Sequence, residues 1–200
     1  MNPYYYVLSN FSDDDIETVR NMFYTKLYPI HKEKAQTSNN KSATGTKQVV
    51  TYFHFNDIKL SVAEQLLFLK YPMLGTDCLI NESGLLGGTI PHIDGQVTQT
   101  SRMCAINFPI TGGNELSPTV FFGQPHDYEH YYDESKRTSY IKEGVIPVEK
   151  DRVTLLDKPV LINVKTWHTV KNFNTATRIA FSWSCRPGVT YQDAYKALSR

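Results

Sequence analysis

The sequence predicts a mainly β protein, either a β-sandwich or a jelly roll, with helices flanking the sheets. From residue 77 onward, eight or nine short aromatic and β-branched runs alternate with turn-forming clusters over about 110 residues. The 200 residues also include 13 tyrosines and 10 phenylalanines, which strands favour. No internal repeat or linker divides the chain, so we expect residues 1–200 to form one domain.

The N-terminal segment, residues 1–76, is expected to support this core with helices and strands. Residues 4–8 predict a short strand. Ser12 predicts the start of a helix whose apolar positions reach Leu27. Pro29 either ends this helix or closely follows its end. The polar residues 31–48 predict a long loop, either a lid over a site or, as we favour, a plain surface connection.

The remaining elements follow from local patterns. Residues 49–55 alternate as a strand, and residues 61–71 predict a helix that opens with a Ser61/Glu64 capping box and stops at Pro72. The β core is expected to span about residues 77–187, and a helix over residues 190–199 should pack outside it.

Bulk properties exclude several classes of protein. The formal net charge of +1 provides no strong field for recruiting nucleic acid or membrane. The three cysteines, without CxxC spacing, argue against a disulfide framework or a structural zinc site. The N-terminus lacks the features of a signal peptide, and no run approaches the roughly 20 apolar residues of a membrane span. We therefore expect a soluble, cytoplasmic protein.

A candidate metal site begins with His92 and Asp94. On a strand, residues two apart project from the same face, so an imidazole and a carboxylate can chelate one cation. His168, in a late strand segment, is the best third donor. Two histidines and one carboxylate leave coordination positions open, as in non-haem Fe(II) oxygenases. HxD alone is a weak motif, because a histidine is often only a structural residue.

Arg178 raises the weight of this interpretation. A turn-rich NFNT separates it from His168, which predicts that both residues lie on neighbouring strands of one hairpin. Alternation then places Arg178, Ala180 and Ser182 on one face. A buried guanidinium requires a partner, and a small dicarboxylate would supply one. The alternative is a salt bridge to an acidic side chain at a sheet edge.

These motifs resemble those of a known family. The matching segments are GGTIPHIDG, SRMCAINFPI, PVLINVKTWHTVKN and RIAFSWSCRP, between about Ile80 and Pro187. They resemble the 2-oxoglutarate/Fe(II)-dependent dioxygenases of double-stranded β-helix fold (jelly roll, cupin-like), and look most similar to small stand-alone members from phages and bacteria. The N-terminal quarter carries no matching motif.

The resemblance implies a function and its cofactors. His92, Asp94 and His168 would bind Fe(II), and Arg178 would hold the distal carboxylate of the co-substrate 2-oxoglutarate. Oxidative decarboxylation with O2 would yield succinate and CO2 and be coupled to hydroxylation of an unidentified prime substrate, with a protein side chain as the first expectation. Ascorbate would stimulate turnover, and a phage-encoded member would act in the host cytoplasm. The oligomeric state is not readable.

Three further residues are candidates for the co-substrate site. Ser182 would add a hydroxyl to the carboxylate held by Arg178, and Asn107 would hydrogen-bond 2-oxoglutarate or a bound water. Arg102 would contact the inner carboxylate or the prime substrate. Ordinary strand hydrogen bonding and a surface ion pair are the alternatives for Asn107 and Arg102.

Two other classes of function compete with the oxygenase. A cupin-like module would hold a metal or a small ligand without turnover, and would need no anchor such as Arg178. A hydrolase would use zinc at His126 and His130, which a helical turn starting at Pro125 would place on one face. We disfavour this zinc pair because no base or fourth ligand accompanies it. Substrate contact is a better use of this segment than zinc binding, because three tyrosines there could stack on a substrate: Tyr128, Tyr131 and Tyr132. We favour plain surface packing over either use.

Overall fold

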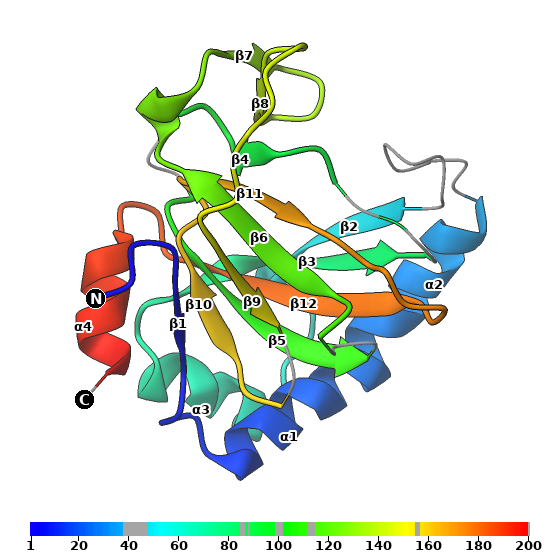
Figure 1. The fold of residues 1–200 in the computed structure, drawn as a ribbon. Coiled ribbons are helices and arrows are strands. Elements are labelled where there is room, and N and C mark those ends of the chain that lie inside the picture. Colours follow the sequence, from blue (N-terminus) through cyan, green and yellow to red (C-terminus); the bar gives the residue numbers. More distant parts are fainter. Residues whose placement is uncertain are drawn as a thin grey trace.

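The computed structural model describes residues 1–37, 48–84, 87, 89–98, 102–111, 115–154 and 157–199. Two six-stranded antiparallel sheets pack face to face (Figure 1). The major sheet contains, in order across it, β1 (Tyr5–Val7), β10 (Val160–Ile162), β5 (Ala105–Thr111), β12 (Arg178–Cys185), β3 (Leu74–Ser83) and β2 (Gln48–His54). The minor sheet contains β7 (His130–Asp133), β8 (Thr138–Ile141), β4 (His92–Asp94), β11 (Trp167–Val170), β6 (Pro118–Gly123) and β9 (Asp151–Thr154).

Successive strands of the core cross between the sheets. β3, β5, β10 and β12 belong to the major sheet, whereas β4, β6 and β11 belong to the minor one. This alternation is the double-stranded β-helix, and it confirms the predicted mainly β jelly roll with flanking helices. The hairpin β7–β8 projects from the body beyond β4 (Figure 1).

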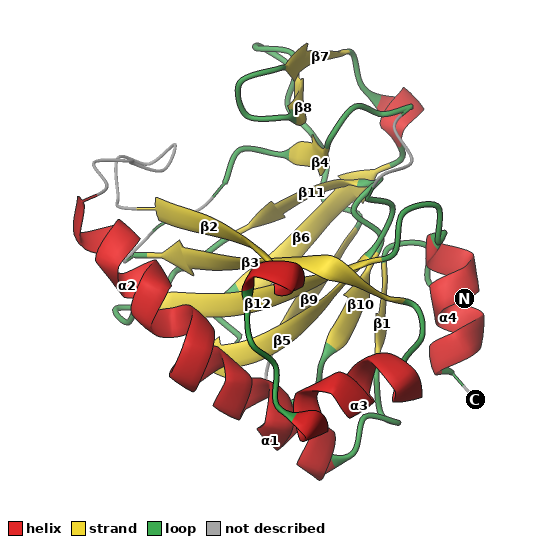
Figure 2. Cartoon of the chain, turned by 180° about the vertical axis from the view of Figure 1, so that it is seen from behind, coloured by secondary structure: helices red, strands yellow, loops and turns green. Residues whose placement is uncertain are grey.

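Four helices flank the sheets: α1 (Asp13–Met22), α2 (Tyr28–Thr37), α3 (Val62–Lys70) and α4 (Tyr191–Leu198). α1, α2 and α3 cover the outer face of the major sheet (Figure 2). Strand alternation on β12 explains the division, because Ile179, Phe181 and Trp183 join the core beneath the helices. Ala180 points the other way and packs with Phe121 between the sheets. None of the helices in the described ranges has the length and apolar character needed to cross a bilayer.

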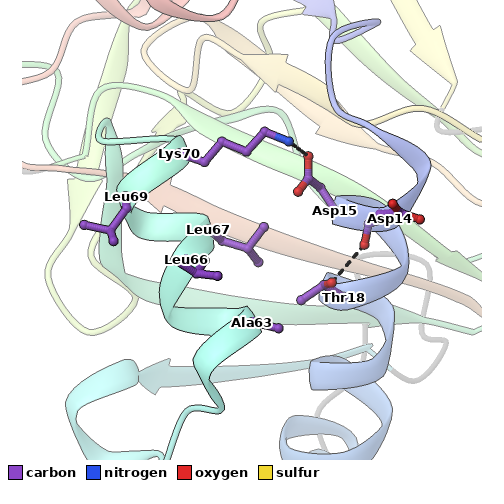
Figure 3. Close-up of a pocket in the computed structure, with 8 residues that line it drawn as sticks. All are labelled: Asp14, Asp15, Thr18, Ala63, Leu66, Leu67, Leu69 and Lys70. Carbon is purple, nitrogen blue, oxygen red and sulfur yellow. Dashed lines mark hydrogen bonds and ion pairs between the residues drawn. The ribbon is translucent and has the colours of Figure 1, made fainter.

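Capping boxes begin three of the helices. Ser12 caps α1 with Asp15, and Ser61 caps α3 with Glu64, as predicted from their spacing. Asp15 also accepts a hydrogen bond from Tyr71 and pairs with Lys70, which ties α1 to α3. Figure 3 shows the groove between these helices, which the Lys70–Asp15 pair spans. The third box begins α4.

The predicted loop over residues 31–48 is wrong in its first part. The chain continues from α1 through a π-helical turn (Phe23–Leu27) into α2, which reaches Thr37. In a regular α-helix, a proline ring clashes with the carbonyl four residues earlier. The π turn, which ends two residues before Pro29, widens the helix and relieves this clash. His31, expected in the loop, is fully buried and contacts Thr51. Residues 38–47 lie outside the described residues, so a lid there stays a prediction.

The core beneath the helices can be tested by its contribution to the free energy of unfolding. Phe181 is fully buried in it, so Phe181→Ala removes a large apolar side chain and leaves a cavity. We expect the free energy of unfolding to fall by about 3–5 kcal/mol in urea denaturation. Leu69→Ala is the control, because Leu69 is 77% exposed on α3 and should change stability by less than about 0.5 kcal/mol. Equal effects of the two substitutions would contradict this assignment of the core.

Candidate active site

His92 and His168 meet on neighbouring strands of the minor sheet. β11 pairs antiparallel with β4, and His168 lies directly opposite His92. Their ring centroids are 4.5 Å apart. Asp94 projects from the same face of β4, and one ligand atom from each of the three residues lies within 4.8 Å of the others. The three residues predicted to bind metal therefore converge on one point.

Backbone carbonyls set the tautomer of both imidazoles. His92 Nδ1 lies 2.8 Å from the carbonyl oxygen of Ile90, and His168 Nδ1 lies 2.9 Å from that of Thr166. A carbonyl oxygen can only accept, so each Nδ1 carries the proton and donates it. Nε2 then has a free lone pair, which is the form that a metal ligand needs, with the ring orientation held from behind.

The backbone of Asp94 is anchored on both sides. Its N–H donates to the Val164 carbonyl at 3.2 Å, and its carbonyl accepts from Lys165 Nζ at 2.8 Å. The next residue, Gly95, has a φ of 73°, a left-handed conformation that glycine adopts without strain. The chain can therefore leave β4 immediately after the carboxylate.

Electrostatics keep Asp94 and His168 in the forms that bind a cation. Burial opposes ionisation of Asp94, but the Arg102 guanidinium and then the two imidazoles outweigh it and hold the pKa of that carboxyl well below its usual range. Burial, and next the neighbouring His92, lower the pKa of His168 to about 4. His168 is therefore neutral, and Asp94 charged, at neutral pH.

Arg178 opens β12 on the inner face of the major sheet, where its side chain is 1% exposed. Its Nε, Nη1 and Nη2 atoms are all buried without a hydrogen-bond partner among the residues that the structure describes. Burial lowers its pKa to about 10, so it remains charged. The predicted hairpin is wrong, because β11 and β12 lie in different sheets. The chain passes from the minor sheet to the major sheet between these two strands, so Arg178 lies on the sheet that faces His168.

The other predicted site residues lie on the same interior. Ser182 shares the inner face of β12 with Arg178, and Asn107 is its register partner on β5. Asn107 Oδ1 is buried and unpartnered within the described part of the chain. Arg102, just before β5, pairs with Asp94 at 3.0 Å and donates to Ser182 at 2.9 Å.

Thr119 was missed from the sequence. It lies on β6 opposite Val170, at the end of the sheet from which the chain crosses to Arg178. Its hydroxyl is buried and, among the described residues, has no partner. The one sequence signal that could have indicated its inward orientation is its position two residues before Phe121, because residues two apart on a strand share a face. All residues of this strand are buried, so the signal is weak.

Two tyrosines extend the line of His168 and His92 across neighbouring strands toward solvent and form an aromatic row with them. Tyr140 on β8 lies opposite His92, and Tyr131 on β7 lies opposite Tyr140. The centroids are 6.3 Å apart for His92 and Tyr140, and 5.8 Å apart for Tyr140 and Tyr131. Tyr131 is 52% exposed. The sequence indicated Tyr131 as a residue that could stack on a substrate. It did not indicate Tyr140, because the place of Tyr140 opposite His92 depends on strand register.

The segment around His126 differs from the prediction. Only a three-residue 3-10 turn (Pro125–Asp127) follows Gln124, and His130 begins β7, so the two histidines do not share a helical face. A helical i, i+4 pair needs a longer turn than this one. Tyr128 packs against the buried cluster that contains Trp167 and Phe122, and its hydroxyl donates to the Phe122 carbonyl, in line with the packing role that we favoured.

Solved structures of the same fold support the architecture. No protein-family model matches the chain, and no curated protein sequence is significantly similar to it. A prolyl-4-hydroxylase from Pseudomonas putida is 12% identical, with 92% of each chain covered and a TM-score of 0.54. The non-heme alpha ketoglutarate dependent carbocyclase SnoK from nogalamycin biosynthesis is 14% identical, with 92% of this chain and 79% of that chain covered and a TM-score of 0.56. The epimerase SnoN, in complex with Fe3+, alpha ketoglutarate and nogalamycin RO, is 12% identical, with 89% and 86% covered and a TM-score of 0.50.

These similarities define the class of fold. The chain has the double-stranded β-helix found in 2-oxoglutarate/Fe(II)-dependent oxygenases, which confirms for the fold the resemblance that the motifs predicted. At identities of 12 to 14%, the similarity concerns the fold alone, and function has to be argued from the site.

Burial of His168 predicts a pH dependence of stability for the metal-free protein. Its pKa is about 4 in the folded chain and 6.5 ordinarily. Between these values the unfolded chain binds more protons, so the free energy of unfolding should fall as pH drops from 6.5 to 4. The His168 share is on the order of 3 kcal/mol. Asp94, with a lowered pKa, loses its contribution only below this window.

The measurement is urea denaturation with a chelator present, at several pH values. His168→Gln should lose less stability over this window than the wild type. His126→Gln is the control, because the His126 side chain is 81% exposed, and it should follow the wild type. A His168→Gln variant with the wild-type pH dependence would contradict the assignment.

Proposed function

We propose that this chain is an Fe(II)- and 2-oxoglutarate-dependent oxygenase that hydroxylates a prime substrate. The buried guanidinium of Arg178, with no partner among the described residues, carries the proposal. An unpaired buried charge costs several kcal/mol, so the site requires an anion. An arginine fork matches a carboxylate through two parallel hydrogen bonds, and the distal carboxylate of 2-oxoglutarate fits that requirement.

The donor set fits iron. Two imidazoles in the Nε2-accepting form and one carboxylate on a single face are the ligands of non-haem Fe(II) oxygenases. When bound, Fe(II) would supply O2 activation coupled to oxidative decarboxylation of 2-oxoglutarate. The formal charges of Fe(II), the Asp94 carboxylate, 2-oxoglutarate and Arg178 sum to zero.

Other interior residues have roles in this proposal. The Thr119 hydroxyl, near the Arg178 end of the core, would donate to the distal carboxylate, and Asn107 would bond the co-substrate farther along. Phe121 and Ala180 pack together between the sheets, and they would exclude water from the reacting groups.

The prime substrate is proposed to be a protein side chain that enters along the aromatic row. Tyr140 and Tyr131 extend the row of metal ligands onto the projecting hairpin. Across three strands spaced about 4.8 Å apart, the row extends about 10 Å beyond His92, which suits an extended peptide better than a single small metabolite. A mass-spectrometric screen of candidate proteins for a gain of one oxygen tests this proposal.

We also propose that residues 1–200 act as one oxygenase domain in the cytoplasm. β1 and β2, from the N-terminal segment, form both edges of the major sheet, so this segment belongs to the core that holds the site. The three cysteines are free and buried, which is consistent with a reducing compartment.

Turnover separates the oxygenase from a cupin-like binding module. The purified protein, incubated with Fe(II), ascorbate and 2-oxoglutarate, should release succinate even without prime substrate. His168→Ala should abolish this release, because two ligands hold the metal poorly. Absence of succinate release, together with absence of 2-oxoglutarate binding in calorimetry, would favour the binding module.

Arg178→Met should weaken 2-oxoglutarate binding to the Co(II)-loaded protein by at least about 30-fold, because loss of one partner from a buried charge pair costs about 2–5 kcal/mol. Isothermal titration calorimetry measures the effect. Arg152→Met is the matched control, since the Arg152 side chain is 60% exposed and pairs with Glu149 on the surface. Wild-type affinity in Arg178→Met would show that the anchor is assigned to the wrong residue.

A further inference from the structure

Arg102 joins the two sheets beside the candidate metal ligands. Its Nη1 lies 3.0 Å from Asp94 Oδ2 in the minor sheet, and its Nη2 donates to Ser182 Oγ in the major sheet at 2.9 Å. The side chain is only 20% exposed. Because a guanidinium is planar and rigid, its two arms hold both acceptors in one geometry.

The polar atoms of Asp94 have separate partners. The backbone N–H and carbonyl bind Val164 and Lys165, as described above. In the carboxylate, Oδ2 faces Arg102, whereas Oδ1 lies 3.5 Å from His92 Nε2, the atom with the free lone pair. Rotation of the carboxylate would break the contact with Arg102, so Oδ1 is the oxygen presented to the imidazoles.

We propose that Arg102 is a positioning residue that keeps Asp94 a ligand through one oxygen only. This inference rests on the proposed function. A co-substrate that chelates the metal needs two coordination positions, and O2 needs another. A carboxylate that turned both oxygens toward the cation would occupy one of them. Arg102 prevents this by holding Oδ2 in the opposite direction.

The charge of Arg102 indicates that its role is to position the Asp94 carboxylate and not to increase the affinity for the metal. A guanidinium on one oxygen of Asp94 repels a divalent cation on the other oxygen. Once Asp94 is ionised, the contact therefore gives no further electrostatic gain in metal binding. Arg102 instead keeps the site open for the co-substrate, and through Ser182 it ties Asp94 to the strand that carries Arg178.

The test uses Co(II) ions as the probe, because their visible absorption depends on the number and geometry of their ligands. Arg102→Met should change the Co(II) spectrum before any co-substrate is added, since Asp94 then binds through both oxygens. Its Co(II) affinity should be equal to or tighter than that of the wild type. Its affinity for 2-oxoglutarate should be at least about 10-fold weaker, because one position is occupied.

Two variants separate the alternatives. Arg178→Met should weaken 2-oxoglutarate binding but leave the Co(II) spectrum without co-substrate unchanged, which distinguishes loss of an anchor from loss of positioning. Arg102→Lys keeps the charge but loses the two-armed fork, so it should alter the spectrum in the same direction as Arg102→Met. It also serves as the second variant if Arg102→Met fails to fold.

Three results would overturn the inference: a wild-type Co(II) spectrum in Arg102→Met, a Co(II) affinity as low as that of Asp94→Ala, or a wild-type spectrum in Arg102→Lys. Failure of the proposed function itself is distinguishable. In that case the wild-type protein fails to bind Co(II), 2-oxoglutarate or both, whereas failure of this inference alone leaves both bound.

Discussion

The antiparallel pairing of β11 with β4 is the constraint on which the site depends, because it sets His168 opposite His92. A slip of one residue would turn His168 to the other face of the sheet. Trp167 prevents such a slip. It is fully buried on the outer face, in a cluster with Ile93 and Phe122, so a slip would force this large side chain into the interior between the sheets.

The two sheets supply opposite charges to the interior between them. The minor sheet carries Asp94 among the candidate metal ligands, and the major sheet carries the guanidinium of Arg178. Each of these charged groups is costly to bury without a partner. A cation bound at one end and a dicarboxylate extending to the other would satisfy both. Arg102, in contact with both sheets, connects the two halves of this arrangement. Under the proposed function, the interior would be organised around ligands that the protein chain does not itself supply.

Local sequence signals predicted the elements whose ends are determined by nearby side chains. Ser12 and Ser61 cap helices as predicted. Alternation along β12 correctly placed Ala180 on one face with Arg178 and Ser182, and this is the inner face of the sheet. The prediction failed at Pro29, where a π turn allows the helix to continue. The helical arrangement that the disfavoured zinc pair required does not form either, because His130 pairs in a strand rather than following His126 on a helix. In both cases, packing with distant segments outweighed a local preference.

Local patterns were enough to predict the fold class and the candidate ligands, because strand alternation and the spacing of His92 and Asp94 are local properties. They did not predict that Arg178 lies in the sheet opposite His168, that Thr119 faces the interior or that Arg102 holds Asp94. These are contacts between strands far apart in the chain. Their geometry depends on register and on crossings between sheets, which a period of two residues does not encode.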